Sequence, residues 1–88
     1  MKYTVLVERY AQKQLMNLNK VDIPIIKDAI ASLADNPRPS GSKKLKGEPA
    51  WRIRVGNYRV IYEIYDDQVI VIVVSVGHRK NVYKRRHK

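Results

Sequence analysis

Residues 50–64 read AWRIRVGNYRVIYEI, and this stretch decides the fold. Apolar and polar side chains alternate on both sides of the pair Gly56-Asn57. A period of two is typical of β-strands, because successive side chains point to opposite faces of a sheet. A Gly-X pair between two such runs is typical of a tight turn. The sequence therefore predicts a β-hairpin in which Arg54 lies directly opposite Arg59.

The segments around this hairpin predict two more strands and a first helix. Residues 2–8 favour β-structure and predict the first strand of the chain. Residues 69–76 are almost continuously apolar, which suits a central strand that is buried on both faces and ends at Val76-Gly77. Within residues 9–19, apolar side chains recur at the spacing of one helix face, at Ala11, Leu15 and Leu18.

A second helix is predicted to begin after Asp22, which is a good N-cap and allows Pro24 in the first turn. Its apolar stripe consists of Ile26, Ala29, Ile30 and Leu33. The prolines of residues 36–39 end the helix, and residues 37–49, rich in Pro, Gly, Ser and Lys, are predicted to be a loop. An Asp66-Asp67 turn precedes the last strand.

The predicted fold is a small α+β domain with the order β-α-α-β-β-β. Its antiparallel-rich sheet has four strands, in which the first pairs with one of the later three, and a helical hairpin covers one face. Eighty-eight residues are enough for one domain, residues 1–88, in which residues 84–88 form a basic C-terminal tail.

The composition excludes several classes of function. The chain has no cysteine, which excludes disulfides, a thiolate zinc site and a cysteine nucleophile. It has no phosphate-binding loop motif, no spaced acid pair for two metals and too few histidines for a metal site, so we expect neither metal nor cofactor. No apolar run approaches the roughly 18–20 residues of a membrane span, and no signal peptide is visible, so a cytoplasmic protein is expected.

Positive charge is concentrated in two segments. Eighteen Lys and Arg oppose eight Asp and Glu, for a net charge of +10. Residues 38–59 and 78–88 each carry +6, whereas residues 1–37 carry +1 and residues 60–77 carry −3. If the fold joins the two basic segments, they form one surface for a polyanion. The alternative is two solvated segments that aid solubility.

Arginines crowd one face of the predicted hairpin. Arg54 opposes Arg59, and Arg52 lies two residues away on the same face. Like charges directly opposite in a sheet are destabilising, so a bound polyanion would supply the missing negative charge. The alternative is that each arginine extends along an edge to water. Beyond the last strand, Arg79 and Tyr83 extend the set; Tyr83 can stack on a base, donate a hydrogen bond or serve as a hydrophobic anchor.

Such a face could cleave RNA without a metal, because the 2′-OH is an internal nucleophile that needs only positioning and charge stabilisation. Four motifs occur together in the chain: Leu45-Lys46-Gly47, Trp51-Arg52-Ile53-Arg54, Gly56-Asn57-Tyr58-Arg59 and Val76-Gly77-His78-Arg79. With them, the chain resembles the RelE family of bacterial toxins, within the RelE/ParE group, over nearly its whole length. The resemblance implies a type II toxin that cuts mRNA in the ribosomal decoding site without metal or cofactor and is inhibited by a cognate antitoxin.

The resemblance also implies roles for individual residues. Arg59 would stabilise the transition state, Arg79 would protonate or stabilise the leaving group, and Tyr83 would activate the 2′-OH or stack on the substrate. Arg52 and Arg54 stand where the best-known members have lysines; a guanidinium binds phosphate but is no general base, which leaves that role to Tyr83 or His78. The expected RNA-binding residues are Lys43, Lys44, Lys46, His78, Lys80, Lys84, Arg85 and Arg86.

Two other functions stay open. The first is a ParE-like toxin that binds DNA gyrase without nuclease activity, and the second is a non-catalytic RNA- or ribosome-binding module. The expected partners are mRNA, the ribosome and an acidic, RelB-like antitoxin that folds on binding. We expect the toxin alone to be a monomer, with a higher-order complex forming with the antitoxin and no membrane contact.

Overall fold

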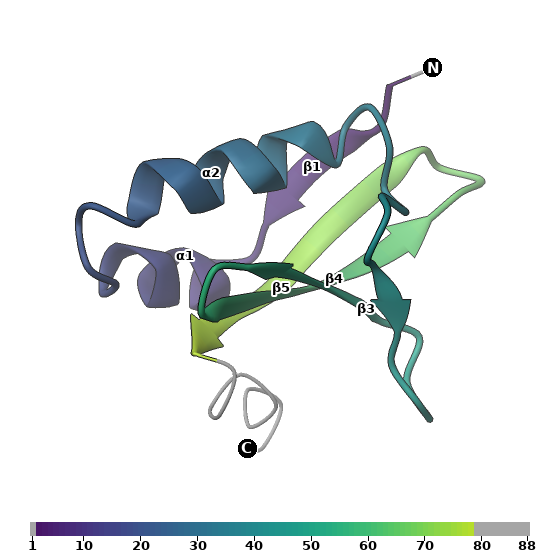
Figure 1. The fold of residues 1–88 in the computed structure, drawn as a ribbon. Helices are drawn as coiled ribbons and strands as arrows, with labels where there is room; N and C mark the ends of the chain where they lie inside the picture. Colours follow the sequence, from purple (N-terminus) through teal and green to yellow (C-terminus); the bar gives the residue numbers. More distant parts are fainter. Residues whose placement is uncertain (1, 79–88) are drawn as a thin grey trace.

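The computed structural model describes residues 2–78, which form a curved sheet with two helices on one face (Figure 1). The elements, in chain order, are β1 (Thr4–Val7), α1 (Arg9–Met16), α2 (Ile23–Ser32), β2 (Lys43–Lys44), β3 (Trp51–Val55), β4 (Tyr58–Tyr65) and β5 (Ile70–His78). The predicted α+β class and the helical pair on one face are confirmed. In residues 2–78, no helix is long and apolar enough to cross a membrane.

The sheet is mixed, with the strand order β1-β5-β4-β3-β2. β1 pairs in parallel with β5, and all other neighbours are antiparallel. The expectation that the first strand pairs with a later one is therefore confirmed. The predicted number of four strands is wrong, because Lys43 and Lys44 leave the predicted loop to pair with Arg52 and Trp51 at the edge of the sheet.

The central hairpin has the predicted register. Val55 pairs with Tyr58 around the Gly56-Asn57 turn, and Arg54 pairs with Arg59. Gly56 has a φ of +60°, in the left-handed region that favours glycine, which explains why a two-residue turn can close here. The hairpin therefore fixes which side chains share each face of the sheet.

The last strand is longer than the sequence predicts. β5 continues past Val76 to His78, because β4 offers partners to both added residues: Arg59 pairs with Gly77, and Tyr58 pairs with His78. The pairing shifts register at Ile61/Tyr62. Near this irregularity, Gln14 of α1 accepts a hydrogen bond from the backbone N–H of Val76 at 2.8 Å. A helix side chain thus pairs with a backbone donor of β5 close to the irregular point.

The main core lies between the helices and the sheet. Both predicted helical stripes face it, although α1 is shorter than predicted and Leu18 packs against the core from beyond its end. The buried members of the core are Ala11, Leu15, Ile26, Ile30, Leu33, Ile53, Val60, Tyr62, Val71, Val73 and Val76. A smaller cluster of Ala50, Ile61 and Val74, with Leu45 and Ile72 against it, lies apart from this core. β5 contributes to both clusters, as its apolar run predicts.

Asp22 occupies the predicted N-cap position of α2, but its side chain does not cap the helix. Its carboxylate instead accepts a hydrogen bond of 2.7 Å from the hydroxyl of Tyr58. This hydrogen bond raises the pKa of Tyr58 above its ordinary value. Asp22 therefore ties the start of α2 to the start of β4.

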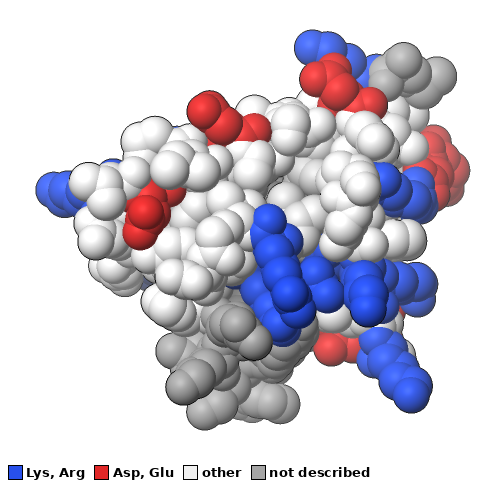
Figure 2. Space-filling model, in the orientation of Figure 1, with Lys and Arg blue, Asp and Glu red and all other residues white. Residues whose placement is uncertain are grey.

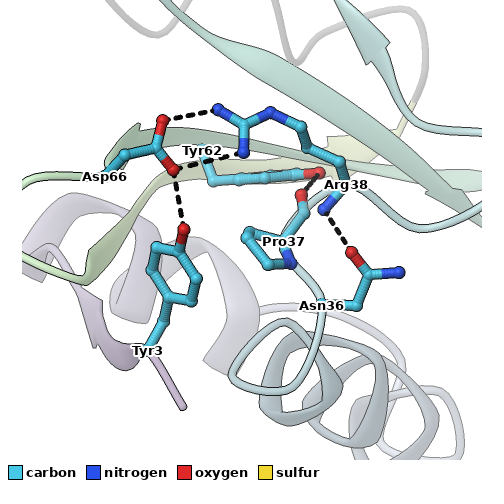
Figure 3. A network of polar contacts seen from close by, with 6 residues as sticks. All are labelled: Tyr3, Asn36, Pro37, Arg38, Tyr62 and Asp66. Atoms are coloured by element: carbon cyan, nitrogen blue, oxygen red, sulfur yellow. Dashed lines mark hydrogen bonds and ion pairs between the residues drawn. The ribbon is translucent and has the colours of Figure 1, made fainter. Parts of the chain in front are cut away.

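An ion pair anchors the loop after α2 (Figure 3). Arg38 donates two hydrogen bonds, of 3.2 and 2.8 Å, to the carboxylate of Asp66 in the β4–β5 turn. Tyr3 donates a third, of 2.7 Å, to the same carboxylate. The hydrogen bonds from Arg38 and then Tyr3 lower the pKa of Asp66. The Arg38 guanidinium also lies 5.2 Å from the ring centre of Trp51, which brings the loop against β3.

A buried hydrogen bond from β4 also holds this loop. The hydroxyl of Tyr62, whose side chain is fully buried, donates to the carbonyl of Pro37 at 2.7 Å. Asn36 accepts a hydrogen bond from the backbone N–H of Arg38 with its side-chain oxygen. Figure 3 shows these contacts next to the Tyr3–Asp66 pair, so the loop is fixed from two directions before it reaches β2.

Candidate nucleic-acid interface

Lysines and arginines gather over the end of the sheet where β2 and β3 lie. Figure 2 shows their side chains next to one another on this part of the surface, with a few acidic atoms below them and the other acidic side chains apart from them. We call this region the basic surface. Its described members are Lys43, Lys44, Lys46, Arg52, Arg54 and Arg59. The structure thus brings together all predicted site residues of the first basic segment.

The strand pairing places two like-charge pairs on the basic surface. Arg54 is directly opposite Arg59 in the β3–β4 ladder, as the sequence predicts. Lys43 is directly opposite Arg52 in the β2–β3 ladder, which the sequence does not predict. The intervening Ile53 packs into the main core, so the arginines on either side of it point to the face away from the helices. Each such pair opposes folding by a few tenths of a kcal/mol or more.

Burial differs among these arginines. Arg54 is exposed and Arg59 is half-buried, with a buried Nε atom. Arg52 is only 9% exposed, although burying a charge is costly unless an opposite charge compensates. No acidic residue within residues 2–78 forms an ion pair with Arg52. The least exposed cation of the basic surface, Arg52, therefore also faces another cation, Lys43, across the ladder.

A cavity of about 530 Å³ lies at the side of β3, between α2 and the loop that follows it. Lys43, Arg52 and Arg54 line the cavity, together with Ser32 and Ser40. The two serines could not be found from the sequence, since they come from a helix end and a loop and show no shared spacing. The cavity and the basic surface therefore meet along β3, whose arginine side chains point to the face away from the helices.

His78 lies on the helix side of the sheet. It pairs with Tyr58, and the two rings are 5.1 Å apart between their centres. Because Tyr58 packs against the main core, His78 shares that face rather than the face of Arg54 and Arg59. Its predicted contact with RNA stays a prediction, and the contact would be made from the end of the sheet.

The predicted site residues of the second basic segment lie outside the described residues. They are Arg79, Lys80, Tyr83, Lys84, Arg85 and Arg86. The predicted tail of residues 84–88 also lies outside the described residues. The last described residue, His78, pairs with Tyr58 at the end of β5. Among residues 2–78, no three His, Cys, Asp or Glu side chains are grouped as metal ligands would be.

A second, mainly apolar groove lies on the opposite side of the molecule from β2, along β1. Its volume is about 750 Å³, and it lies between β1 and the two helices, lined among others by Leu6, Met16 and Ile30. Leu6 is 48% exposed and Met16 is 64% exposed. β1 is also an edge strand, with a neighbour only on the side of β5. The groove thus combines exposed apolar side chains with an open strand edge.

Comparison with known proteins identifies the family. A family model described as "ParE toxin of type II toxin-antitoxin system, parDE" matches residues 5–83. The chain belongs to the RelE/ParE family of type II toxins. It is 32% identical over 88 residues to toxin RelG of Mycobacterium tuberculosis, covering 97% of this chain and 100% of that protein. It is 29% identical over 83 residues to the mRNA interferase toxin RelE of Escherichia coli, covering 91% of this chain and 86% of that protein.

The fold comparison agrees with the sequence comparison. The toxin–antitoxin complex RelBE2 of Mycobacterium tuberculosis contains a chain that matches with a TM-score of 0.80 and 27% identity, over 90% of this chain and 100% of that one. The predicted resemblance to RelE-type toxins is therefore confirmed. The fold class, the helix pair and the mixed sheet are those of this toxin family.

Proposed function

We propose that this toxin is a metal-independent endoribonuclease that cuts mRNA in the decoding site of the ribosome and so stops translation and growth. The observation that carries the proposal is the direct opposition of Arg54 and Arg59 on the open face of the sheet. A pair of this kind opposes folding, and a bound phosphate would compensate it. The name of the Escherichia coli relative, an mRNA interferase, supports the same activity.

In the proposed reaction the 2′-oxygen of one nucleotide attacks the adjacent phosphorus. A bond forms between these atoms, the bond from phosphorus to the 5′-oxygen of the next nucleotide breaks, and that oxygen takes a proton. Arg59 stabilises the charge that develops on the phosphate, helped by Arg54 and Arg52. Arg79 stabilises or protonates the leaving oxygen, and Tyr83 activates the 2′-OH or stacks on a base.

The remaining cations of the proposed interface hold RNA phosphates outside the reacting bond. Lys43 and Lys44 lie on β2, and Lys46 follows them in the next loop. Binding of this kind weakens with rising salt, because each neutralised phosphate releases counterions. Lys80, Lys84, Arg85 and Arg86, together with His78, would extend this contact beyond the end of β5.

The test is cleavage of a translated mRNA by the purified toxin, read by primer extension. The wild type should cut within codons on translating ribosomes. Arg59→Gln keeps much of the side-chain volume and should lower the cleavage rate by about 100-fold or more, the usual effect of losing a transition-state donor. Lys13→Gln removes an exposed cation on α1, far in sequence from the basic surface, and should cut normally.

The roles in the second basic segment need their own variants. Arg79→Ala and Tyr83→Phe should fold normally and lose cleavage. Normal cutting by both would contradict their assignment. Absence of any cut by the wild type would contradict the nuclease itself.

A second candidate, a ParE-like toxin that inhibits DNA gyrase, is favoured by the description of the matching family model. A gyrase supercoiling assay with the same protein separates the two functions. A nuclease should cut mRNA and leave supercoiling unaffected. A gyrase inhibitor should leave mRNA intact and inhibit supercoiling. A non-catalytic RNA-binding module would give salt-dependent binding with neither effect.

We further propose that a RelB-like, acidic antitoxin inhibits this toxin by docking along β1. The groove offers exposed Leu6 and Met16, and the open edge of β1 can add a strand. The solved Mycobacterium tuberculosis relative is a toxin–antitoxin complex. A net charge of +10 attracts an acidic partner, and the toxin without it would be a monomer in the cytoplasm, where ribosomes are.

A further inference from the structure

The end of β5 has a strand on one side only. β1 pairs with β5 no further than Val73, so among residues 2–78 the only strand beside residues 74–78 is β4. Figure 1 shows this end of β5 near the turn between β3 and β4. The last pair of the ladder joins Tyr58 to His78. A pair at the end of a strand opens readily unless side chains hold it closed.

Two side-chain contacts hold this last pair. The rings of Tyr58 and His78 lie 5.1 Å apart between their centres, with their planes at 59°, a tilted arrangement of the kind that aromatic pairs prefer. The hydroxyl of Tyr58 donates a hydrogen bond of 2.7 Å to the carboxylate of Asp22, at the start of α2. Tyr58 is half-buried against the main core, whereas His78 is exposed. The ring that supports His78 is therefore itself fixed by the core and by Asp22.

Asp22 provides a second, independent observation. An aspartate at an N-cap ordinarily accepts a hydrogen bond from a backbone N–H of its own helix. Asp22 stands at the N-cap of α2 but makes no such hydrogen bond. Its carboxylate binds Tyr58 instead, 36 residues further along the chain. The helix thus forgoes a stabilising contact, and the molecule gains a fixed Tyr58 ring.

The same pair adjoins both arginines to which the proposed reaction assigns the phosphate and the leaving oxygen. Arg59 follows Tyr58 in the chain and pairs with Gly77 in the ladder. Arg79 follows His78 in the chain. Opening of the last pair would therefore disturb the strand that carries Arg59 and release the point from which the chain continues to Arg79.

We infer that Asp22 and Tyr58 are positioning residues for the proposed cleavage and act through His78. They keep the end of β5 paired with β4, so that the chain leaves the sheet from a fixed point beside Arg59. The inference rests on the proposed nuclease function, and it adds two residues that need not touch the RNA. Loss of their contact should slow the chemical step more than it weakens binding, because a displaced catalytic group lowers the rate while the phosphate-binding cations stay in place.

The first test is single-turnover cleavage of mRNA on ribosomes, measured at increasing toxin concentration. Asp22→Ala removes the acceptor, and Tyr58→Phe removes the donor but keeps the ring; each should lower the maximal rate by about 10- to 100-fold. The toxin concentration that gives half the maximal rate should change by less than about twofold. Asp22→Asn keeps an oxygen acceptor and should restore most of the rate. Tyr65→Phe is the matched control, because Tyr65 donates a 2.7 Å hydrogen bond to Glu63 at the other end of β4, and it should cut at the wild-type rate.

The second test is hydrogen exchange of the backbone amides, which observes the end of β5 without any cleavage. In Asp22→Ala and Tyr58→Phe, the amides of residues 76–78 should exchange about tenfold faster, the effect of losing one charge-assisted hydrogen bond. The amides of residues 71–73, which lie between β1 and β4, should change less. Ile30→Val, in the main core, is the control for a general loss of stability; it should lower Tm and leave the maximal cleavage rate unchanged.

The outcomes separate this inference from the proposed function. If the wild type cuts mRNA and Asp22→Ala and Tyr58→Phe cut equally fast, the positioning role is refuted and the nuclease stands. An equal loss of rate in Ile30→Val, or a loss that appears only in the half-maximal concentration, would also refute it, in favour of general stability or of binding. Unchanged exchange at residues 76–78 would show that Asp22 and Tyr58 do not hold the end of β5. A wild type that cuts no mRNA would overturn the nuclease proposal and this role with it.

Discussion

Replacing Tyr62 with phenylalanine removes a buried hydroxyl that holds the loop before the basic surface through Pro37 and that also contacts the side chain of Ser42. The Tyr62 side chain is fully buried, and its hydroxyl donates to the carbonyl of Pro37 at 2.7 Å. Tyr62→Phe keeps the ring, so no large cavity forms. The carbonyl of Pro37, a buried residue, loses its donor and is left in an apolar environment. Such a loss costs about 1–3 kcal/mol in the free energy of unfolding.

Urea and thermal unfolding measure this cost directly. For a domain of this size, about 1 kcal/mol corresponds to a fall of roughly 4–8 °C in Tm. Tyr65→Phe is the matched control, because Tyr65 also donates a 2.7 Å hydrogen bond, to Glu63, but its side chain is 38% exposed. Water replaces that bond, so the control should lose less than about 0.5 kcal/mol. Equal losses in the two variants would refute the argument that burial decides the value of the bond.

The same pair of proteins predicts a dependence on pH. Burial raises the pKa of Tyr62 from 10.0 to about 12. Between these two values the folded state keeps the Tyr62 proton that the unfolded state loses. The contribution of the Tyr62 hydroxyl to the free energy of unfolding is therefore fully present below pH 10 and is lost as the pH rises towards 12. The stability difference between wild type and Tyr62→Phe should narrow over this window. A constant difference from pH 9 to 12 would contradict the assigned cause.

Three further outcomes follow from the structure. Gln14→Leu removes the acceptor for the backbone N–H of Val76 and should lower the free energy of unfolding in urea by about 1–3 kcal/mol. The control Gln14→Glu keeps an acceptor and should retain most of the stability. Asp66→Asn should make Tm less sensitive to acid, because Arg38 lowers the pKa of Asp66, and the wild type therefore loses this stabilisation as the pH falls through that lowered value. Leu6→Asp, on the exposed lining of the β1 groove, should weaken antitoxin binding in calorimetry while Tm and mRNA cleavage stay unchanged; normal binding would contradict docking at the groove.

The sequence predicted the parts of the fold that local patterns determine. The Gly56-Asn57 turn, the Arg54–Arg59 register and the apolar stripes of both helices follow from periods of two and 3.6 residues, and they are confirmed except that α1 ends at Met16, before Leu18. β2 could not be predicted, because two lysines show no period and pair only where β3 offers an edge. The end of β5 was also missed, since β4 and not the apolar run sets the limit at His78.

The cations of the candidate site could be predicted from the sequence, whereas the cavity beside them could not. Charge counting located the first basic segment, and the hairpin register located the Arg54–Arg59 pair. The cavity depends on Ser32, Ser40 and Lys43, which come from three separate elements, so only tertiary structure brings them together. The anchor of the loop, an ion pair between Arg38 and Asp66, likewise joins residues 28 positions apart.

The two faces of the sheet contribute differently to the stability of this small domain, and the difference matches the proposed function. The face of the sheet under the helices carries the main apolar core, whereas the open end carries two opposed pairs of cations. Each opposed pair lowers stability without improving the packing of the core, and Arg52 adds the burial of a charge. The loop contacts of Tyr62 and Arg38 hold this end together in the absence of a ligand. A bound anion would lessen the repulsion within both opposed pairs, so this end of the sheet is suited to negative charge.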